Sequence, residues 1–352
     1  MKLAVHVLLA VMATAVDGFS TSTTSRIPTF GVPSSSTALS MRSSKAKSSN
    51  VASQTTILNA ATMAEETITQ EESQPAAAAK SYLDDGFVFG LEGSGLARPK
   101  GKEAVVVVEG DDLETQPWQV AFVSATFLGL GGFAATAFME MLQNNGGNLP
   151  MTTLQSTILF FSSWVIADFG SGVLHWSVDN YGNGRTPIMG SIIAAFQGHH
   201  SAPWTITQRG FFNNVSKLCI PFGLITMSVL SAVTGPSATF FLSLFCGWEI
   251  LSQEFHKWSH TTKSQVPDYV NKLQSLGLTI GRPTHAQHHF APYKGNYCIV
   301  SGFCNPWLDN SGFFRRLEHV VYRMNGIEAN AWKLDSELKE RTLGGEYELL
   351  KK

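Results

Sequence analysis

The feature that most constrains this chain is a set of long runs without charged side chains. Residues 115–139 contain no Asp, Glu, Lys or Arg, and after Glu140 the next charged residue is Asp168. Each of these two runs is about 25 residues long, and a helix needs about 20 residues to cross a bilayer. Residues 218–248 are also free of charge, and the turn signal Gly235-Pro236 divides them into two segments. We therefore expect an all-α integral membrane protein with about four transmembrane helices in two hairpins.

Eight of the ten histidines form four short clusters between residues 175 and 289. They are His175, His199, His200, His256, His260, His285, His288 and His289. Histidine is the commonest neutral nitrogen ligand for metals, and a pair four residues apart shares one helix face. His256 and His260 are therefore expected to share a face, as are His285, His288 and His289 if that segment is helical.

Adjacent histidines behave differently. On a helix they diverge by about 100°, so His199 and His200 would not point at one ion. The pattern predicts a site with two metal ions, or with one ion and a partner that orients its ligands. His6 and His319 have no histidine neighbours, and we expect them to be ordinary polar residues.

Two hairpins would return the chain to the side from which it started, which places every histidine cluster on one side. The connections on the opposite side, residues 144–150 and 234–236, contain no Lys or Arg. The histidine side carries Arg185, Arg209, Lys217 and Lys257. By the positive-inside rule the histidine side is cytoplasmic or stromal. A helical hairpin buried in a large soluble core is the competing interpretation of the uncharged runs.

The first third of the chain has the composition of targeting sequence. Lys2 precedes an apolar run and the small residue Gly18, so residues 1–18 are expected to be a signal peptide. Residues 19–64 are rich in Ser and Thr, contain Arg and Lys but no acidic residue, and are expected to be a transit-peptide-like segment. This two-part address is typical of plastids bounded by extra membranes, and plain secretion with a Ser-rich stalk is the alternative. Residues 65–110 are expected to be a disordered linker.

Cysteine spacing and net charge argue against other classes of site. Cys219 and Cys246 fall in expected spans, and Cys298 and Cys304 lack a CxxC spacing. We therefore expect neither a disulfide framework nor a zinc-cysteine site. The formal net charge of -2 leaves no basic surface of the kind that nucleic acid binding requires.

The residues around the histidines carry a family resemblance. They read ADFGSGVLHW at 167–176, FQGHH at 196–200, FHKWSH at 255–260, HAQHH at 285–289, YCI at 297–299 and GFCN at 302–305. These motifs resemble the lipid desaturase family, which contains the fatty acid desaturase 4-like plastid enzymes acting on palmitate at the 3-position and plasmanylethanolamine desaturase. The resemblance covers about residues 117–332. Residues 111–332 are thus expected to form a membrane lipid desaturase domain, followed by a charged tail at 333–352.

The resemblance implies a membrane-embedded di-iron site, with O2 as co-substrate, that removes two hydrogens from neighbouring carbons of a lipid chain. An unactivated C–H bond has no acidic proton, so a redox-active metal has to generate the oxidant. Imidazole also suits zinc, copper and nickel, so iron comes from the resemblance and not from the ligand type. Asp179, four residues after His175, is expected to be a ninth ligand or to hold a neighbouring imidazole. Glu249 and Glu254 are weaker candidates for that role.

Substrate, location and electron donor follow from the leader and the resemblance together. The plastid-type leader favours 3-trans desaturation of palmitate on phosphatidylglycerol, in a plastid membrane with the histidine site on the stromal side. Histidines at the ends of the spans would hold the irons near headgroup depth, where Arg209 and Lys257 are candidates for contacting a lipid phosphate. The sequence shows no cytochrome b5-like or iron-sulfur motif, so we expect an external electron donor, ferredoxin in a stroma.

Three other functions stay open at this point. Vinyl-ether formation, as in plasmanylethanolamine desaturase, belongs to the same family and no motif residue separates the two branches. A lipid hydroxylase would use a similar histidine-rich site. A metal transporter is a non-enzymatic alternative, but ionisable groups within spans mark ion pathways and these spans are nearly free of them.

Overall fold

The described part of the chain is entirely helical. The computed structural model describes residues 104, 106 and 111–348, and no strand occurs among them. This confirms the all-α class for these residues. The expected signal peptide, transit-peptide-like segment and linker (residues 1–18, 19–64 and 65–110) lie outside the described residues, apart from Ala104 and Val106.

Two long helices joined by a tight turn come first. α4 spans Pro117–Asn144 and α5 spans Leu149–Asn180. Gly146 and Gly147 in the turn have φ values of 64° and 79°, which a residue with a side chain rarely adopts. The Asn148 side chain then caps α5 by accepting a hydrogen bond from a first-turn backbone N–H. Both helices are long and apolar enough to cross a membrane, judged by length and composition.

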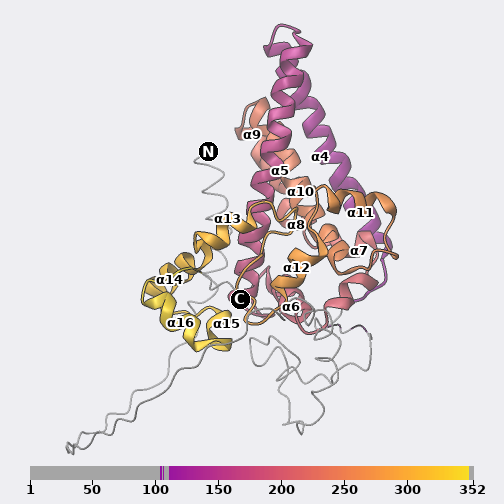
Figure 1. Cartoon of the computed structure of the whole chain (residues 1–352). Helices are drawn as coiled ribbons and strands as arrows, with labels where there is room; N and C mark the ends of the chain where they lie inside the picture. Colours follow the sequence, from indigo (N-terminus) through magenta and orange to yellow (C-terminus); the bar gives the residue numbers. More distant parts are fainter. Residues whose placement is uncertain (1–103, 105, 107–110, 349–352) are drawn as a thin grey trace, which may run out of the picture. The chain divides into compact units, whose positions relative to one another are not determined.

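α10, Pro236–His260, packs against both α4 and α5, and the three helices run side by side in Figure 1. The helix boundary expected at Gly235-Pro236 is present. Gly235 is the residue before the helix and Pro236 is its first residue, where the missing N–H would have no helical partner anyway. Polar side chains, Glu249 among them, lower the hydropathy of α10, and it does not meet the composition of a membrane span.

The segment before α10 is not one continuous helix. α8 spans Cys219–Phe222 and α9 spans Leu224–Val233. The break falls at Gly223, where a Cβ would lie 1.9 Å from the carbonyl oxygen of Cys219. α9 has 10 residues, about half of what a span needs. Among the described residues two helices meet the criteria for a span, so four spans in two hairpins stay a prediction.

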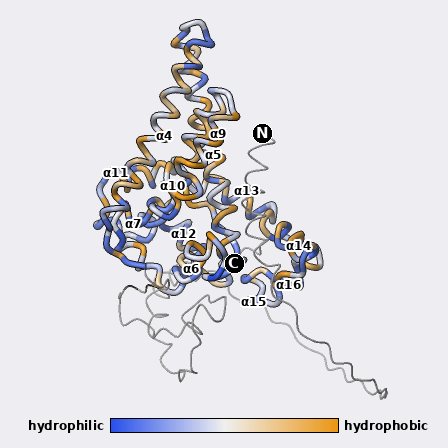
Figure 2. Tube along the Cα trace, turned by 180° about the vertical axis from the view of Figure 1, so that it is seen from behind, coloured by the Kyte–Doolittle hydropathy of each residue, from blue (hydrophilic) through white to orange (hydrophobic). Residues whose placement is uncertain are grey.

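Large apolar side chains project outward from the long helices. Leu128 on α4 is 77% exposed, Leu154 and Phe161 on α5 are 58% and 54% exposed, and Ile225 on α9 is 80% exposed. Figure 2 shows hydrophobic residues along much of α4, α5 and α9. Extended apolar surface of this kind marks a membrane or a partner rather than water.

Shorter helices complete the described part. Between α5 and α10 lie α6 (Gly190–His199), η1 (Pro203–Gln208) and α7 (Phe211–Ser216), and α10 is followed by α11 (Asp268–Ser275) and α12 (Arg282–His288). The C-terminal helices are α13 (Asn305–Asn310), α14 (Phe313–Asn325), α15 (Asn330–Leu334) and α16 (Ser336–Leu343). α15 crosses the expected boundary at residue 332, and Leu338 of α16 is buried in the same apolar cluster as Trp332. Part of the charged tail is therefore packed helix.

A buried carboxylate joins α5 to the loop that follows α12. Asp168 is fully buried, and its Oδ1 accepts hydrogen bonds from the backbone N–H groups of Ser301 (2.7 Å) and Gly302 (2.8 Å). Its Oδ2 accepts from Cys304 N at 2.8 Å. Asn305 closes the same loop, because its side chain bonds both the N–H and the C=O of Cys298. The ADFG, YCI and GFCN motifs are thus one structural unit beside the histidines.

Replacing Asp168 with alanine is expected to lower the free energy of unfolding by about 3 kcal/mol, because three backbone N–H groups lose their acceptor together. Asp168→Asn keeps the size and one acceptor oxygen, so a smaller loss is expected. Thermal unfolding in detergent measures both, with the exposed Asp268→Asn as control. An Asp168→Ala protein that melts like wild type would contradict this role.

Candidate metal centre

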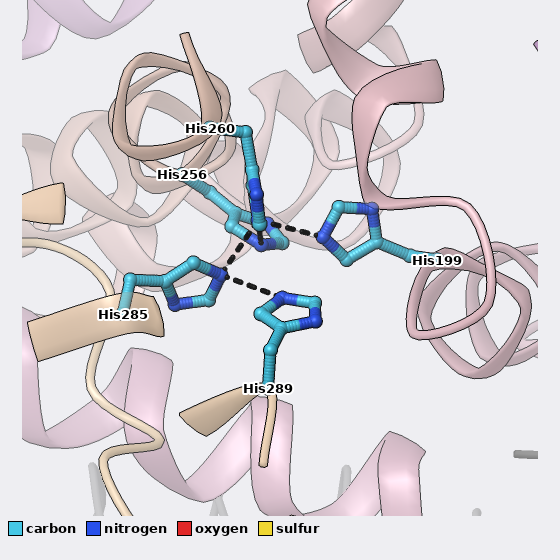
Figure 3. A group of neighbouring side chains, drawn as sticks. All are labelled: His199, His256, His260, His285 and His289. Atoms are coloured by element: carbon cyan, nitrogen blue, oxygen red, sulfur yellow. Dashed lines mark hydrogen bonds between the residues drawn. The ribbon is translucent and has the colours of Figure 1, made fainter. Parts of the chain in front are cut away.

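Five histidines carried by three helices converge on one point. His199 ends α6, His256 and His260 lie on α10, His285 lies on α12, and His289 follows α12 directly. One ligand nitrogen of each ring lies within 4.8 Å of those of the other four. Figure 3 shows the rings pointing toward one another. We call these residues the five-histidine group.

A second group contains the other three histidines and Asp179. Asp179 Oδ2 lies 3.1 Å from His200 Nε2 and 3.4 Å from the Nε2 atoms of both His175 and His288. All four side chains are buried. We call these residues the aspartate group. The two groups thus contain all eight clustered histidines and Asp179, the carboxylate most favoured from the sequence.

Residues adjacent in the sequence enter different groups. Because consecutive helical residues diverge by about 100°, His199 faces the five-histidine group and His200 the aspartate group. His288 and His289 divide in the same way. The segment of His285 and His288 is helical as expected and their ring centroids lie 5.5 Å apart, but His288 belongs to the aspartate group while His285 and His289 belong to the five-histidine group. Spacings of four residues, as in His285 and His289, keep two rings in one group.

Backbone carbonyls fix two rings of the aspartate group. His175 Nδ1 lies 3.0 Å from the carbonyl oxygen of Tyr297, and His288 Nδ1 lies 2.8 Å from that of Gly295. A carbonyl only accepts, so each Nδ1 donates, and in a neutral ring the Nε2 then presents a lone pair. These two Nε2 atoms face Asp179 and have no hydrogen-bond partner among the described residues. Two lone pairs beside a carboxylate repel one another, and a cation between them removes the conflict.

Hydrogen bonds do not satisfy the five-histidine group either. His260 Nε2 lies 2.9 Å from His199 Nε2, 2.8 Å from His285 Nε2 and 3.3 Å from His256 Nε2. One ring nitrogen acts as a single donor or a single acceptor, so at least two of these three contacts lack a proton. Imidazole nitrogens packed this closely fit a transition metal ion as their common partner.

Burial keeps these rings in the form that binds metal. Desolvation, followed by the neighbouring imidazoles, holds the pKa of His285 and of His289 well below the usual histidine value. The pKa of His199 is lowered in the same way by burial and then by the nearby His260. The rings are therefore neutral at neutral pH, which is the state in which a ring nitrogen coordinates a metal.

The two weaker carboxylate candidates lie outside both groups. Glu254 accepts hydrogen bonds from Asn214 (2.9 Å), Lys257 (3.0 Å) and Trp258, and so ties α10 to α7. Glu249 faces α5 at Gly170, where a Cβ would come within 2.3 Å of its Oε1. Lys257, proposed from the sequence for lipid phosphate, is paired with Glu254 at 3.0 Å.

Sequence reasoning missed residues that act through the backbone or through packing. Tyr297 stands in a motif quoted above, yet nothing in the motif indicates that its carbonyl would orient His175. Its hydroxyl also accepts a hydrogen bond from Asn180 at 3.2 Å. Phe196 places its ring 5.2 Å from the His175 ring and 6.0 Å from the His256 ring, and so contacts both groups. Its position in the FQGHH motif was the one available signal.

Comparison with known proteins identifies relatives. Residues 164–332 match the lipid desaturase domain. Fatty acid desaturase 4-like 1, chloroplastic, from Arabidopsis thaliana is 44% identical over 179 residues, which cover 51% of this chain and 61% of the relative. Fatty acid desaturase 4, chloroplastic, from the same plant is 45% identical over 182 residues, or 51% of this chain and 55% of the relative.

More distant similarity extends beyond plants. Plasmanylethanolamine desaturase 1 from Mus musculus is 31% identical over 180 residues, which cover 47% of this chain and 65% of that protein. The matched part of the chain spans less than two thirds of the length of each of these three relatives. No solved structure matches the chain.

Proposed function

We propose that residues 164–332, which match the lipid desaturase domain, form such a domain, and that the protein is an O2-dependent desaturase of membrane lipids. The observation that carries the proposal is the aspartate group, in which the lone pairs of His175 and His288 face the Asp179 carboxylate. Because α10 packs against α4 as closely as against α5, we propose that the domain begins near residue 111.

We assign one iron ion to each group. The five-histidine group would hold one through His199, His256, His260, His285 and His289, and the aspartate group would hold the other through His175, Asp179, His200 and His288. When bound, the irons supply the redox chemistry that an unactivated C–H bond requires. The balanced reaction takes the lipid –CH2–CH2– unit, O2, two electrons and two protons to –CH=CH– and two waters.

The chain itself orients the ligands and excludes water. The carbonyls of Tyr297 and Gly295 hold two imidazoles with Nε2 directed at the site, which avoids a reorientation cost on metal binding. His175, His285 and His288 are 0–1% exposed. A dry site protects a reactive oxidant from side reactions with water.

The outward side chains of α4, α5 and α9 support a membrane location. Residues such as Leu128, Leu154 and Ile225 would contact lipid, while the histidines lie where α5 and α10 end. We propose that this end faces the stroma, because Arg185, Arg209 and Lys217 lie on the histidine side of the predicted topology. Spans formed by the α8–α9 segment and by α10 would complete the four that we expect.

We propose palmitate of phosphatidylglycerol as the substrate, the 3-trans double bond as the product and ferredoxin as the electron donor. The support is the resemblance of the histidine motifs, the plastid-type composition of residues 19–64 and the chloroplastic relatives. Vinyl-ether formation is the second candidate, because a plasmanylethanolamine desaturase is also a relative.

Lipid analysis of a host that expresses the full chain with a stromal-type ferredoxin tests this function. We expect a new 3-trans hexadecenoate in phosphatidylglycerol, and its absence in a host that expresses His288→Ala. An acid-labile vinyl ether would favour the second candidate, and a hydroxylated lipid would favour a hydroxylase. No lipid change, with iron and donor verified, would contradict desaturation, and metal flux into vesicles would then indicate a transporter.

A further inference from the structure

A pocket lies beside the five-histidine group. It lies among α6, η1, α7 and α10 and offers about 70 Å³ to the centre of a water-sized sphere. His199 and His256 line it, and so do the two cations Arg209 and Lys217.

The exposure of the lining residues shows which end of the pocket lies nearer the surface. The side chains of Lys217 and Arg209 are 31% and 15% exposed, whereas His199 and His256 are 9% and 1% exposed. The cations thus lie nearer the surface and the histidines deeper. Further lining residues are apolar: Ile192, Phe196, Ile206 and Leu218. A charged outer part and an apolar inner part match the order of a headgroup followed by an acyl chain.

The two cations already share an anionic partner. Asp111 Oδ2 lies 2.7 Å from Arg209 NH2 and 3.0 Å from Lys217 Nζ, so two positive charges face one negative charge. Burial alone would raise the pKa of Asp111, but the two cations outweigh it and hold that pKa below its usual value. A phosphodiester also carries one negative charge, shared by two oxygens, and Arg and Lys are its usual partners in proteins. The Asp111 carboxylate therefore marks an anion site.

A second polar group in the pocket indicates a headgroup rather than a bare phosphate. Asn214 is 7% exposed and donates through Nδ2 to Gln253 O (3.0 Å) and to Glu254 Oε2 (2.9 Å), which fixes the orientation of the amide. Its Oδ1 has no hydrogen-bond partner among the described residues. A buried acceptor without a donor is costly, and a headgroup hydroxyl or ammonium would supply the donor.

We propose that this pocket binds the phospholipid substrate, with the headgroup phosphodiester between Arg209 and Lys217 in the place that Asp111 now occupies. The ester end of the acyl chain then runs toward His199 and His256. This inference rests on the proposed lipid desaturase function and adds the recognition of the headgroup. Because one pocket of limited size holds both the cations and the histidines, it favours reaction at carbons close to the ester.

Binding of dipalmitoyl-phosphatidylglycerol in detergent to the full chain, with metal chelated, tests the proposal independently of catalysis. Arg209→Gln and Lys217→Gln are each expected to weaken binding by about tenfold or more, the usual loss for a hydrogen bond to a charged group. Asp111→Asn is expected to tighten binding roughly two- to fivefold, because it removes a competing carboxylate at a partly exposed ion pair. Lys272→Gln, an exposed lysine on α11 outside the pocket, is the matched control and should bind like wild type.

Arg209→Gln and Asp111→Asn are expected to change phospholipid binding in opposite directions. This difference distinguishes headgroup recognition from an ion pair that only stabilises the fold. If Asp111→Asn weakened binding as much as Arg209→Gln does, the ion pair would only hold the chain together, and the proposal would fail. Wild-type affinity in both cation variants would overturn it as well. Dipalmitoylglycerol, which lacks the phosphate, should bind all variants equally. Displacement of the phospholipid by an equal concentration of inorganic phosphate would identify a free-phosphate site instead.

Turnover assays distinguish this inference from the proposed function. Phospholipid binding that depends on Arg209 and Lys217, without any desaturated product from wild type, would contradict the reaction and leave the binding site in place. A desaturated product formed with an unchanged KM in both cation variants would contradict the binding site and leave the reaction in place.

Discussion

Asp179→Asn is expected to abolish lipid desaturation while making the metal-free protein more stable. Asparagine has the same size as aspartate, but it has one anionic ligand oxygen fewer and brings an N–H donor. We expect the aspartate group to lose its iron and activity to fall about 100-fold or more. In the metal-free protein the new N–H can donate to a lone pair of His175 or His288, and one buried negative charge disappears. The melting temperature without metal should therefore rise by about 2–4 °C.

This combination is informative because a merely misfolded variant would lose both activity and stability. Iron content by elemental analysis, product formation and thermal unfolding with chelator give the three readouts. Glu254→Gln is the matched control, since Glu254 is a buried carboxylate on α10 outside both groups. Its variant should keep its iron. An Asp179→Asn protein with full iron and activity would show that Asp179 neither binds metal nor orients a ligand.

His260→Ala is expected to have the second large effect. His260 Nε2 lies within 3.3 Å of three other ring nitrogens of the five-histidine group, so its loss removes the most connected ligand. We expect loss of the iron from this group and a fall in activity of about 100-fold or more. Iron stoichiometry and lipid product yield measure the two effects.

His319→Ala provides the comparison for that variant. His319 lies on α14 outside both groups, and its Nδ1 is 2.9 Å from the hydroxyl of Tyr347. Removing it deletes one imidazole and one hydrogen bond but no proposed ligand. If His260→Ala kept the iron content and activity of wild type, as His319→Ala should, the five-histidine group would not hold an iron that desaturation requires.

The clustering of these histidines could be predicted from the sequence because helix periodicity is local. A spacing of four residues fixes that His256 and His260 share a face, whatever packs against them. The 100° step between neighbours likewise predicted that His199 and His200 would serve different ions or partners, and they lie in different groups. Asp179 could be singled out for the same reason, as it lies one turn after His175.

Features that depend on tertiary packing were not predictable. The spacing of His288 permits a place in either the five-histidine group or the aspartate group. Which of the two it enters depends on where α5 and α10 lie. The helix is interrupted at Gly223, where a Cβ would lie 1.9 Å from the Cys219 carbonyl oxygen, whereas the uncharged run looked like one span. The Tyr297 carbonyl that orients His175 belongs to the backbone, so no pattern of side chains in the sequence indicates its role.

The proposed desaturase reaction removes two hydrogens from neighbouring carbons of a phospholipid acyl chain. The most direct measurement is the product mass after incubating the iron-loaded full chain with phosphatidylglycerol that carries fully deuterated palmitate, O2 and reduced ferredoxin. We expect a phospholipid that has lost two deuterium atoms, one from each of two adjacent carbons near the ester. A product in which one deuterium is replaced by a hydroxyl group, or unchanged lipid with both irons bound and the donor oxidised, would contradict it.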